Sequence, residues 1–125
     1  MAKVINSKQN IKHYDLEERT YLFAKNCRDF VNKLPKTLAN LEYGKQLIRA
    51  SGSQASNYIE ANEALSKRDF AHRIKICRKE TKESGLWLKL VEINKNGVLD
   101  KERSGLISES IELRKIFSSI LIKSG

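Results

Sequence analysis

Helix-breaking residues are almost absent from this chain. It contains one proline, Pro35, and six glycines among 125 residues. Between them, apolar residues recur at steps of three, four and seven, the spacing of one face of an α-helix. A chain with such long helical periods and so few breakers folds as a small number of long helices. The sequence therefore predicts an all-α protein.

Start and stop signals divide the first half of the chain into two helices. Asp15 followed by Glu18 is typical of an N-cap with its capping-box partner, and Leu34-Pro35 closes this first helix. The second helix is expected from about Asn40 to Ala64. The inward positions predicted for these two helices are Leu16, Phe23, Cys27, Phe30 and Leu34 in the first, and Leu41, Gly44, Ile48, Ser51, Ala55, Tyr58, Asn62 and Leu65 in the second.

The second half divides in the same way. Ser66 with Asp69 caps a third helix that reaches about Asn94, and the pair Asn96-Gly97 stops it because both residues tolerate positive φ. Asp100 is expected to cap a fourth helix to about Lys123. The inward positions are Phe70, Ile74, Cys77, Thr81, Ser84, Leu88 and Val91 in the third helix, and Leu106, Leu113, Phe117 and Ile120 in the fourth.

The connections between these helices are short, so consecutive helices should be antiparallel neighbours. The predicted fold is an antiparallel up-down-up-down four-helix bundle. A single bundle domain would span residues 15–124 after an N-terminal tail of residues 1–14. The two cysteines, Cys27 and Cys77, fall on inward positions, where small buried thiols are expected rather than a disulfide.

The net charge points to an anionic partner. Lys and Arg number 24 against 15 Asp and Glu, giving a formal charge of +9. Such an excess in a small domain favours nucleic acid above all, or an anionic membrane surface, while plain solubility is the simpler alternative. No apolar run approaches the ~20 residues of a membrane span, and residues 1–14 lack the apolar core of a signal peptide. We therefore expect a cytoplasmic protein without a membrane partner.

The positive charge gathers on one side of the third helix. On a wheel that advances ~100° per residue, its cations fall within a sector of about 60–180° from Phe70. The acidic residues Asp69, Glu80 and Glu83 fall on the other side, with Arg73. We call the seven cations the cationic flank: Lys67, Arg68, Lys75, Arg78, Lys79, Lys82 and Lys89. Such a row could follow a phosphate backbone, or it could simply face solvent or the acidic side of another subunit.

Two helices carry more apolar surface than one seam needs. The third has Ile76, Trp87 and Leu90 on its acidic side, and the second has an extra stripe that includes Tyr43 and Leu47. This pattern favours burial against a second copy of the chain, although ordinary wide-angle core packing is an alternative. The expected oligomer interface is Tyr43, Leu47, Ile76, Trp87 and Leu90.

A longer stretch, RASGSQASNYIEANEALSKRDFAHRIKICRKETKESGLWLKL, resembles the 23S rRNA intervening-sequence protein family, whose members are four-helix-bundle proteins. The upstream segments LEERTYLFAKNCRDFVNKLPKT and QLIRASGSQASNYIEA match the opening helix, the Leu-Pro break and the spacing from Gln-x-x-Arg-Ala to Asn-x-x-Glu. The resemblance covers about Tyr14 to Phe117. The residues that carry it are Gln46, Arg49, Ala50, Asn57, Glu60, Phe70, Glu83, Trp87 and Leu88.

The resemblance implies an antiparallel four-helix bundle that assembles as a ring-like homopentamer. A relative in this family is the accessory protein of diversity-generating retroelements, whose basic surface binds nucleic acid and a reverse transcriptase. One departure is Glu60-Ala61, where many members have Glu-Gly, so this chain is similar to members with a longer uninterrupted helix.

Residues suited to catalysis or metal binding are scarce. The two histidines, His13 and His72, have no second His or Cys at metal-ligand spacing, and Gly44-Lys45 lacks the upstream glycine of a phosphate-binding loop. Arg49 and Glu60 are more typical of structural ion pairs to other helices than of acid–base catalysis. We therefore expect no catalytic residue, no metal, no cofactor and no enzymatic activity.

Two classes of function remain. The first is a basic, oligomeric bundle that binds nucleic acid, RNA in particular, through phosphate contacts with low sequence specificity. The second is an oligomeric scaffold that binds a protein partner, such as a reverse transcriptase.

Overall fold

The computed structural model describes the backbone of residues 8–124 and the side chains from Leu16 onward. This part of the chain forms four helices and no strand: α1 (Lys8–Asn32), α2 (Leu38–Asn62), α3 (Lys67–Leu90) and α4 (Gly97–Ser124). The prediction of an all-α four-helix bundle is confirmed. Residues 1–7 of the expected tail, and the side chain of His13, lie outside the described residues.

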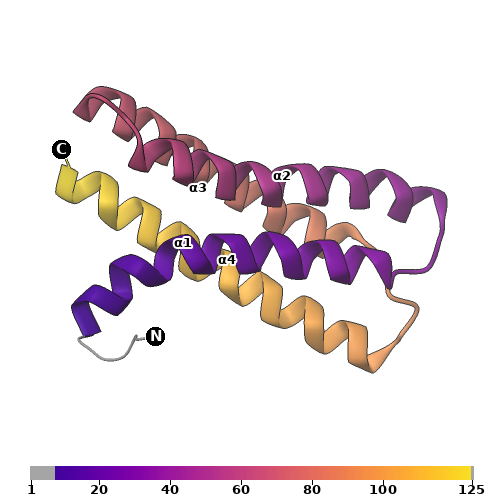
Figure 1. Cartoon of the computed structure of the whole chain (residues 1–125). Helices are drawn as coiled ribbons and strands as arrows, with labels where there is room; N and C mark the ends of the chain where they lie inside the picture. Colours follow the sequence, from indigo (N-terminus) through magenta and orange to yellow (C-terminus); the bar gives the residue numbers. More distant parts are fainter. Residues whose placement is uncertain (1–7, 125) are drawn as a thin grey trace.

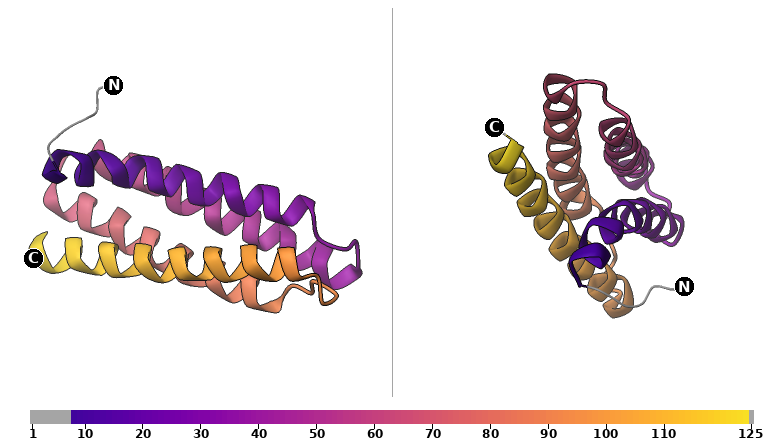
Figure 2. Two further views of the ribbon diagram at one scale, coloured as in Figure 1. Left: turned by 90° about the horizontal axis from the view of Figure 1, so that it is seen from below. Right: turned by 60° about the vertical axis from the view of Figure 1, so that its left-hand side comes forward.

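The helices surround one core in sequential order. α2 packs against α1 and α3, and α4 packs against α3 and α1, so α3 lies diagonally opposite α1. Figure 1 shows the α1–α2 and α3–α4 connections at one end of the bundle and the α2–α3 connection at the other. The start of α1 and the end of α4 also lie at that other end (Figure 2). One side of α3 therefore faces α2, and the other faces α4 and solvent.

A buried asparagine joins the two connections that share an end. The Asn40 side-chain amide donates to the carbonyls of Pro35 and Glu92, both at 2.9 Å. Its carbonyl oxygen accepts from the Glu92 N–H, also at 2.9 Å. One side chain thus satisfies three backbone groups at the helix ends, where helices leave such groups without partners. These bonds hold α2 and α3 in register at that end.

The helix starts match the expected caps in one case and differ in two. The Ser66 hydroxyl accepts from the Asp69 N–H at 3.0 Å, as predicted for α3. α1 begins at Lys8, so Asp15 lies within the helix and is not its cap. α4 begins at Gly97, so Asp100 lies in its first turn and is not its cap.

Asn96 replaces Asp100 as the residue that satisfies the start of α4. Its side-chain oxygen accepts from the Leu99 N–H at 3.0 Å. α3 ends at Leu90, four residues before the predicted Asn94. The positive φ angles of this connection fall on Asn94 and Lys95 instead of the Asn96-Gly97 pair. An Asn side chain therefore starts a helix here where a stop was expected.

The buried residues confirm the predicted inward faces of α1, α3 and α4. They correct the predicted inward face of α2. In α2, Leu41 and Ile48 are about half exposed, and Leu65, beyond the helix, is almost fully exposed. Leu47 and Gln54 are fully buried in their place. The inward face of α2 is thus rotated toward α3 from the predicted seam. Of that seam, Gly44, Ser51 and Tyr58 remain buried.

Buried polar side chains in the core bond mainly to nearby backbone. The Thr81 hydroxyl donates to the Cys77 carbonyl at 2.7 Å, and the Ser84 hydroxyl donates to the Glu80 carbonyl at 2.9 Å. Gln54 reaches across to α1 and donates to the Thr20 carbonyl at 2.7 Å. Hydroxyls that bond within their own helix need no partner from elsewhere, so small polar residues pack tightly in this core.

Candidate nucleic-acid interface

The cationic flank is exposed along the whole of α3. All seven of its side chains lie at the surface, where charged groups keep their hydration. Its first and last members, Lys67 and Lys89, are 22 residues apart, or about 33 Å along a helix. Between them, α3 is uninterrupted. The sequence placed these residues on one side of the helix, and the structure leaves that side free of the core.

These cations lack the carboxylate partners that surface cations often have. In residues 16–124, none of the seven has a carboxylate oxygen within ion-pair distance. Arg78 makes one polar contact, donating to the Ser118 hydroxyl of α4 at 3.3 Å. The positive charge of the flank is therefore available to an external anion.

An arginine of α4 extends the flank. Ser110 lies against Gly85 of α3, because a Cβ added to Gly85 would lie 3.3 Å from the Ser110 Oγ. Ser118 lies against Arg78, and Arg114 is one turn from each serine, on the same side of α4. The antiparallel register places Arg114 opposite Lys82. No signal within α4 could have revealed this, because the neighbour comes from another helix.

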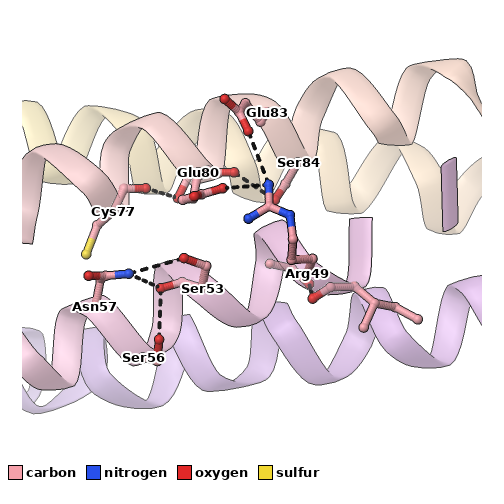
Figure 3. Close-up of polar contacts among 11 residues, drawn as sticks. Arg49, Ser53, Ser56, Asn57, Cys77, Glu80, Glu83 and Ser84 are labelled. Carbon is pink, nitrogen blue, oxygen red and sulfur yellow. Dashed lines mark hydrogen bonds and ion pairs between the residues drawn. The ribbon is translucent and has the colours of Figure 1, made fainter. Parts of the chain in front are cut away.

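The opposite flank of α3 faces α2 and has its charges paired. Arg49 Nη2 of α2 lies 3.4 Å from a Glu80 oxygen and 3.5 Å from a Glu83 oxygen (Figure 3). The Glu80 side chain is only 8% exposed, whereas that of Arg49 is 53% exposed. Burial of a carboxylate at such depth costs free energy unless a cation lies nearby. The expectation that Arg49 forms a structural ion pair to another helix is thus confirmed.

A second polar contact joins α2 and α3, nearer to the α2–α3 connection. Arg73 donates to the Asn57 side-chain oxygen at 2.8 Å. The Asn57 amide donates in turn to the carbonyl and the hydroxyl of Ser53, at 2.9 and 3.1 Å (Figure 3). The one arginine of α3 that lies outside the cationic flank is therefore held by its own chain.

The apolar residues of the α2-facing flank pack within the single chain. Tyr43 and Trp87 stack with ring centroids 5.7 Å apart, and both are partly buried against the core. Leu47 is 0% exposed. The expectation that Leu47 faces a second chain is therefore wrong, because a side chain without exposed surface cannot contact a neighbour. Ordinary packing of α2 on α3 accounts for the extra stripe of α2 at this position.

Other apolar side chains do reach the surface. Ile76 is partly buried and Leu90 is 41% exposed, at the α3 side of the same seam. A different row on α2 is at least as exposed as Leu90, ranging from 41% to 78%. We call it the α2 apolar row, and it consists of Leu38, Leu41, Ile48 and Ile59. Two of its members, Leu38 and Ile59, lie at positions that the sequence did not single out, and Leu41 and Ile48 were expected inside.

The two thiols are sealed in the core. Cys27 and Cys77 are both free and both fully buried. Burial raises the pKa of each thiol from 9.0 to about 12, because the thiolate would lose its hydration. Thiols in this state are poor nucleophiles and poor metal ligands.

In the described part of the chain, no group of three His, Cys, Asp or Glu side chains converges in a way that could hold a metal ion. His72 is exposed on α3. None of the four helices combines the length and apolarity needed to cross a membrane.

The fold and this surface define a small four-helix-bundle protein with a segregated, unpaired cationic face. The chain belongs to the 23S rRNA-intervening sequence protein family, whose model matches residues 12–119. A crystal structure from Bacteroides thetaiotaomicron VPI-5482, described as a protein of unknown function from the S23 ribosomal protein family, is similar. It is 26% identical with a TM-score of 0.70, over 85% of this chain and 97% of that one. No protein of established annotation matches the chain.

Proposed function

We propose that this protein is a non-enzymatic nucleic-acid-binding protein that binds RNA through the cationic flank. The observation that carries the proposal is the difference between the two sides of one helix. On the α2-facing side, Arg73 and the acids Glu80 and Glu83 have partners within the chain. On the other side, seven exposed cations have no carboxylate partner in residues 16–124. Phosphates are the anions that such a row fits best.

The proposed contact recognises the charge of the RNA backbone and depends little on the RNA sequence. Lys and Arg on an exposed helix surface bind phosphate oxygens, which all sequences share. Base recognition would need side chains that reach base edges or stack on bases. The aromatic residues of α3, Phe70 and Trp87, are both partly buried toward the core. We therefore expect similar affinity for unrelated RNA sequences.

The test is a charge reversal in the middle of the flank. Lys75→Glu, Arg78→Glu and Lys82→Glu together should weaken RNA binding by about 100-fold or more near 0.1 M salt. Binding by the parent protein should fall with salt at a log–log slope of about −0.7 to −0.9 per phosphate neutralised. Fluorescence anisotropy with labelled RNA measures both quantities.

The matched control carries the same change in net charge elsewhere. Lys25, Lys36 and Lys101 are exposed and lie outside α3, so their triple reversal to Glu lowers the charge equally. This control should keep affinity within about 5-fold of the parent, because long-range charge alone contributes less than direct contact. If the flank variant folds and binds RNA as tightly as this control, the flank is only a solvated face.

The second candidate function, an oligomeric scaffold for a protein partner, is favoured by a separate observation. The α2 apolar row exposes four aliphatic side chains on one helix, which single domains usually bury against something. Assembly into a homo-oligomer, with the pentamer that the resemblance implies, would cover such a row and repeat the cationic flank around a ring.

Light scattering on the purified chain tests the assembly. An oligomer should form at micromolar concentration, and Ile48→Glu with Ile59→Glu should dissociate it, since both side chains are half exposed. If the parent chain is already a monomer at this concentration, the substitutions will leave its mass unchanged. That result would contradict the oligomeric scaffold.

A further inference from the structure

The cations of α3 are grouped at regular intervals. Lys67 and Arg68 stand at the first turn, four cations lie within residues 75–82, and Lys89 stands in the last turn. The centres of these groups are about 11 residues apart, or ~16 Å along the helix. We call them the first, middle and last clusters.

The intervals between the clusters are uncharged on this side. Ala71 separates the first two clusters on the wheel, and Gly85 with Leu86 separates the second pair. Leu86 is 49% exposed, so the gap is open surface at this residue, while Gly85 lies against Ser110 of α4. The charge of the flank is therefore periodic along about 33 Å of rigid helix.

The period matches a double helix better than a single strand. One turn of B-form duplex extends about 34–36 Å, and along one side of it two backbone strands alternate with two grooves. A straight rod laid along the duplex meets a phosphate ridge, a groove, a second ridge, a second groove and the first strand again. The ridges are unevenly spaced because the two grooves of B-form DNA differ in width, and the long Lys and Arg side chains allow three clusters within one turn's length to reach all three.

The surface also differs from those that usually bind single strands. Proteins that bind single strands line a groove with aromatic side chains on which bases stack. The cationic flank lies on the outer surface of a helix, and beside it the partly buried Phe70 lines a hollow with Lys67 at the first turn alone. Such a surface can bind the outside of a duplex without separating its strands.

We propose that the ligand of the cationic flank is the phosphate backbone of a double helix, with α3 lying along about one helical turn. This inference rests on the proposed nucleic-acid function. The middle cluster, widened by Arg114 of α4, contacts one phosphate ridge, and the first and last clusters contact the ridges on either side. The same phosphate chemistry is offered by duplex RNA and by duplex DNA.

Binding to duplexes of different length tests the arrangement. A GC-rich RNA duplex of about 18 base pairs should bind at least ~10-fold more tightly than an oligouridine of the same length per strand. A duplex of about 6 base pairs is about 20 Å long and reaches at most two of the three clusters, so its affinity should be lower by ~10-fold or more.

The decisive variant, which we call the end-cluster variant, removes the charge of the first cluster. Lys67→Gln with Arg68→Gln should weaken binding of the long duplex by about 10-fold and of the short duplex by less than ~2-fold. Lys36→Gln with Lys101→Gln is the matched control and should alter neither. A DNA duplex of equal length separates the sources: similar affinity supports phosphate contacts alone, and preference for RNA supports recognition of A-form geometry.

Three outcomes bear on the proposals differently. If oligouridine binds as tightly as the long duplex, the duplex inference is overturned while RNA binding stands. If the end-cluster variant weakens long and short duplexes equally, α3 does not lie along the duplex, and the inference is again overturned. If no nucleic acid binds at low salt, the proposed function itself fails.

Discussion

The two flanks of α3 belong to one helix but differ in how their charges are compensated. On the α2-facing flank, the buried Glu80 is paired with Arg49, and Trp87 stacks on Tyr43. On the cationic flank, the side chains are exposed and find no carboxylate partner within residues 16–124. A charge that is buried must be compensated within the chain, whereas an exposed charge is stabilised by water. The first flank thus serves the fold, and the second is available to a ligand.

The first prediction concerns the two buried thiols, which lie in the core between the flanks. Cys77 lies on the inward line of α3, and Cys27 of α1 belongs to the same core. Each thiol should react with a disulfide reagent at least ~1,000-fold more slowly in the native protein than in denaturant, because reaction requires opening of the bundle. Rapid labelling of Cys77 in the native state would show that the two flanks are wrongly separated.

The pKa of these thiols adds a dependence on pH. In the unfolded chain the thiols ionise near pH 9.0, but in the fold burial raises their pKa to about 12. Between these values the unfolded state gains ionisation that the folded state lacks, so the free energy of unfolding should fall as pH rises above about 9. Urea unfolding at pH 8 and pH 10 measures this, and a Cys27→Ala, Cys77→Ala variant should show a smaller fall.

The next largest effect is expected at the aromatic stack. Trp87→Ala should lower the free energy of unfolding by about 2–3 kcal/mol, less than for a fully buried Trp because the ring is partly exposed. Trp87→Phe should cost less than ~1 kcal/mol, since it keeps a stacking ring and removes a buried Nε1–H that has no partner.

Leu86→Ala, at the neighbouring position on the cationic side, is the control for that substitution. Leu86 is half exposed, so its loss should change the free energy of unfolding by less than ~1 kcal/mol. Equal costs for Trp87→Ala and Leu86→Ala, measured by thermal or urea unfolding, would contradict the assignment of the stack to the interior of one chain.

A pair of arginine substitutions compares the flanks directly. Arg49→Gln leaves Glu80 buried without its cation and should lower the free energy of unfolding by about 1–2 kcal/mol. Arg78→Gln removes only an exposed contact to Ser118 and should cost less than ~0.5 kcal/mol. Chemical denaturation of both variants decides between this view and one in which the two arginines are equivalent.

The smallest effect on stability is expected from the cationic flank itself. Neutralising Lys75, Lys79 and Lys82 with Gln should leave the free energy of unfolding within ~0.5 kcal/mol of the parent, or raise it slightly at low salt by relieving repulsion. RNA binding should nevertheless weaken strongly in the same variant. A loss of stability comparable to that of Arg49→Gln would mean that the flank supports the fold.

Local periodicity determined much of this protein. The number and order of the helices, the inward faces of α1, α3 and α4, and the side of α3 on which the cations lie all followed from residue spacing. These features depend on the fixed 3.6-residue turn, which places residues of one helix relative to one another whatever surrounds them. The expected capping at Ser66 followed for the same reason, because an N-cap bond spans only three residues.

The tertiary structure decided the features that depend on two helices at once. α2 offers two apolar stripes, one with Leu47 and one with Ile48, and only the positions of α1 and α3 select Leu47 for the core. The pairing of Arg49 with Glu80 joins residues 31 apart in sequence, and Ser118 of α4 contacts Arg78 of the flank. The spacing of residues along one helix does not determine which face of a neighbouring helix that helix packs against. That choice is made by the packing of whole faces, where burial of apolar area and compensation of buried charge are satisfied together.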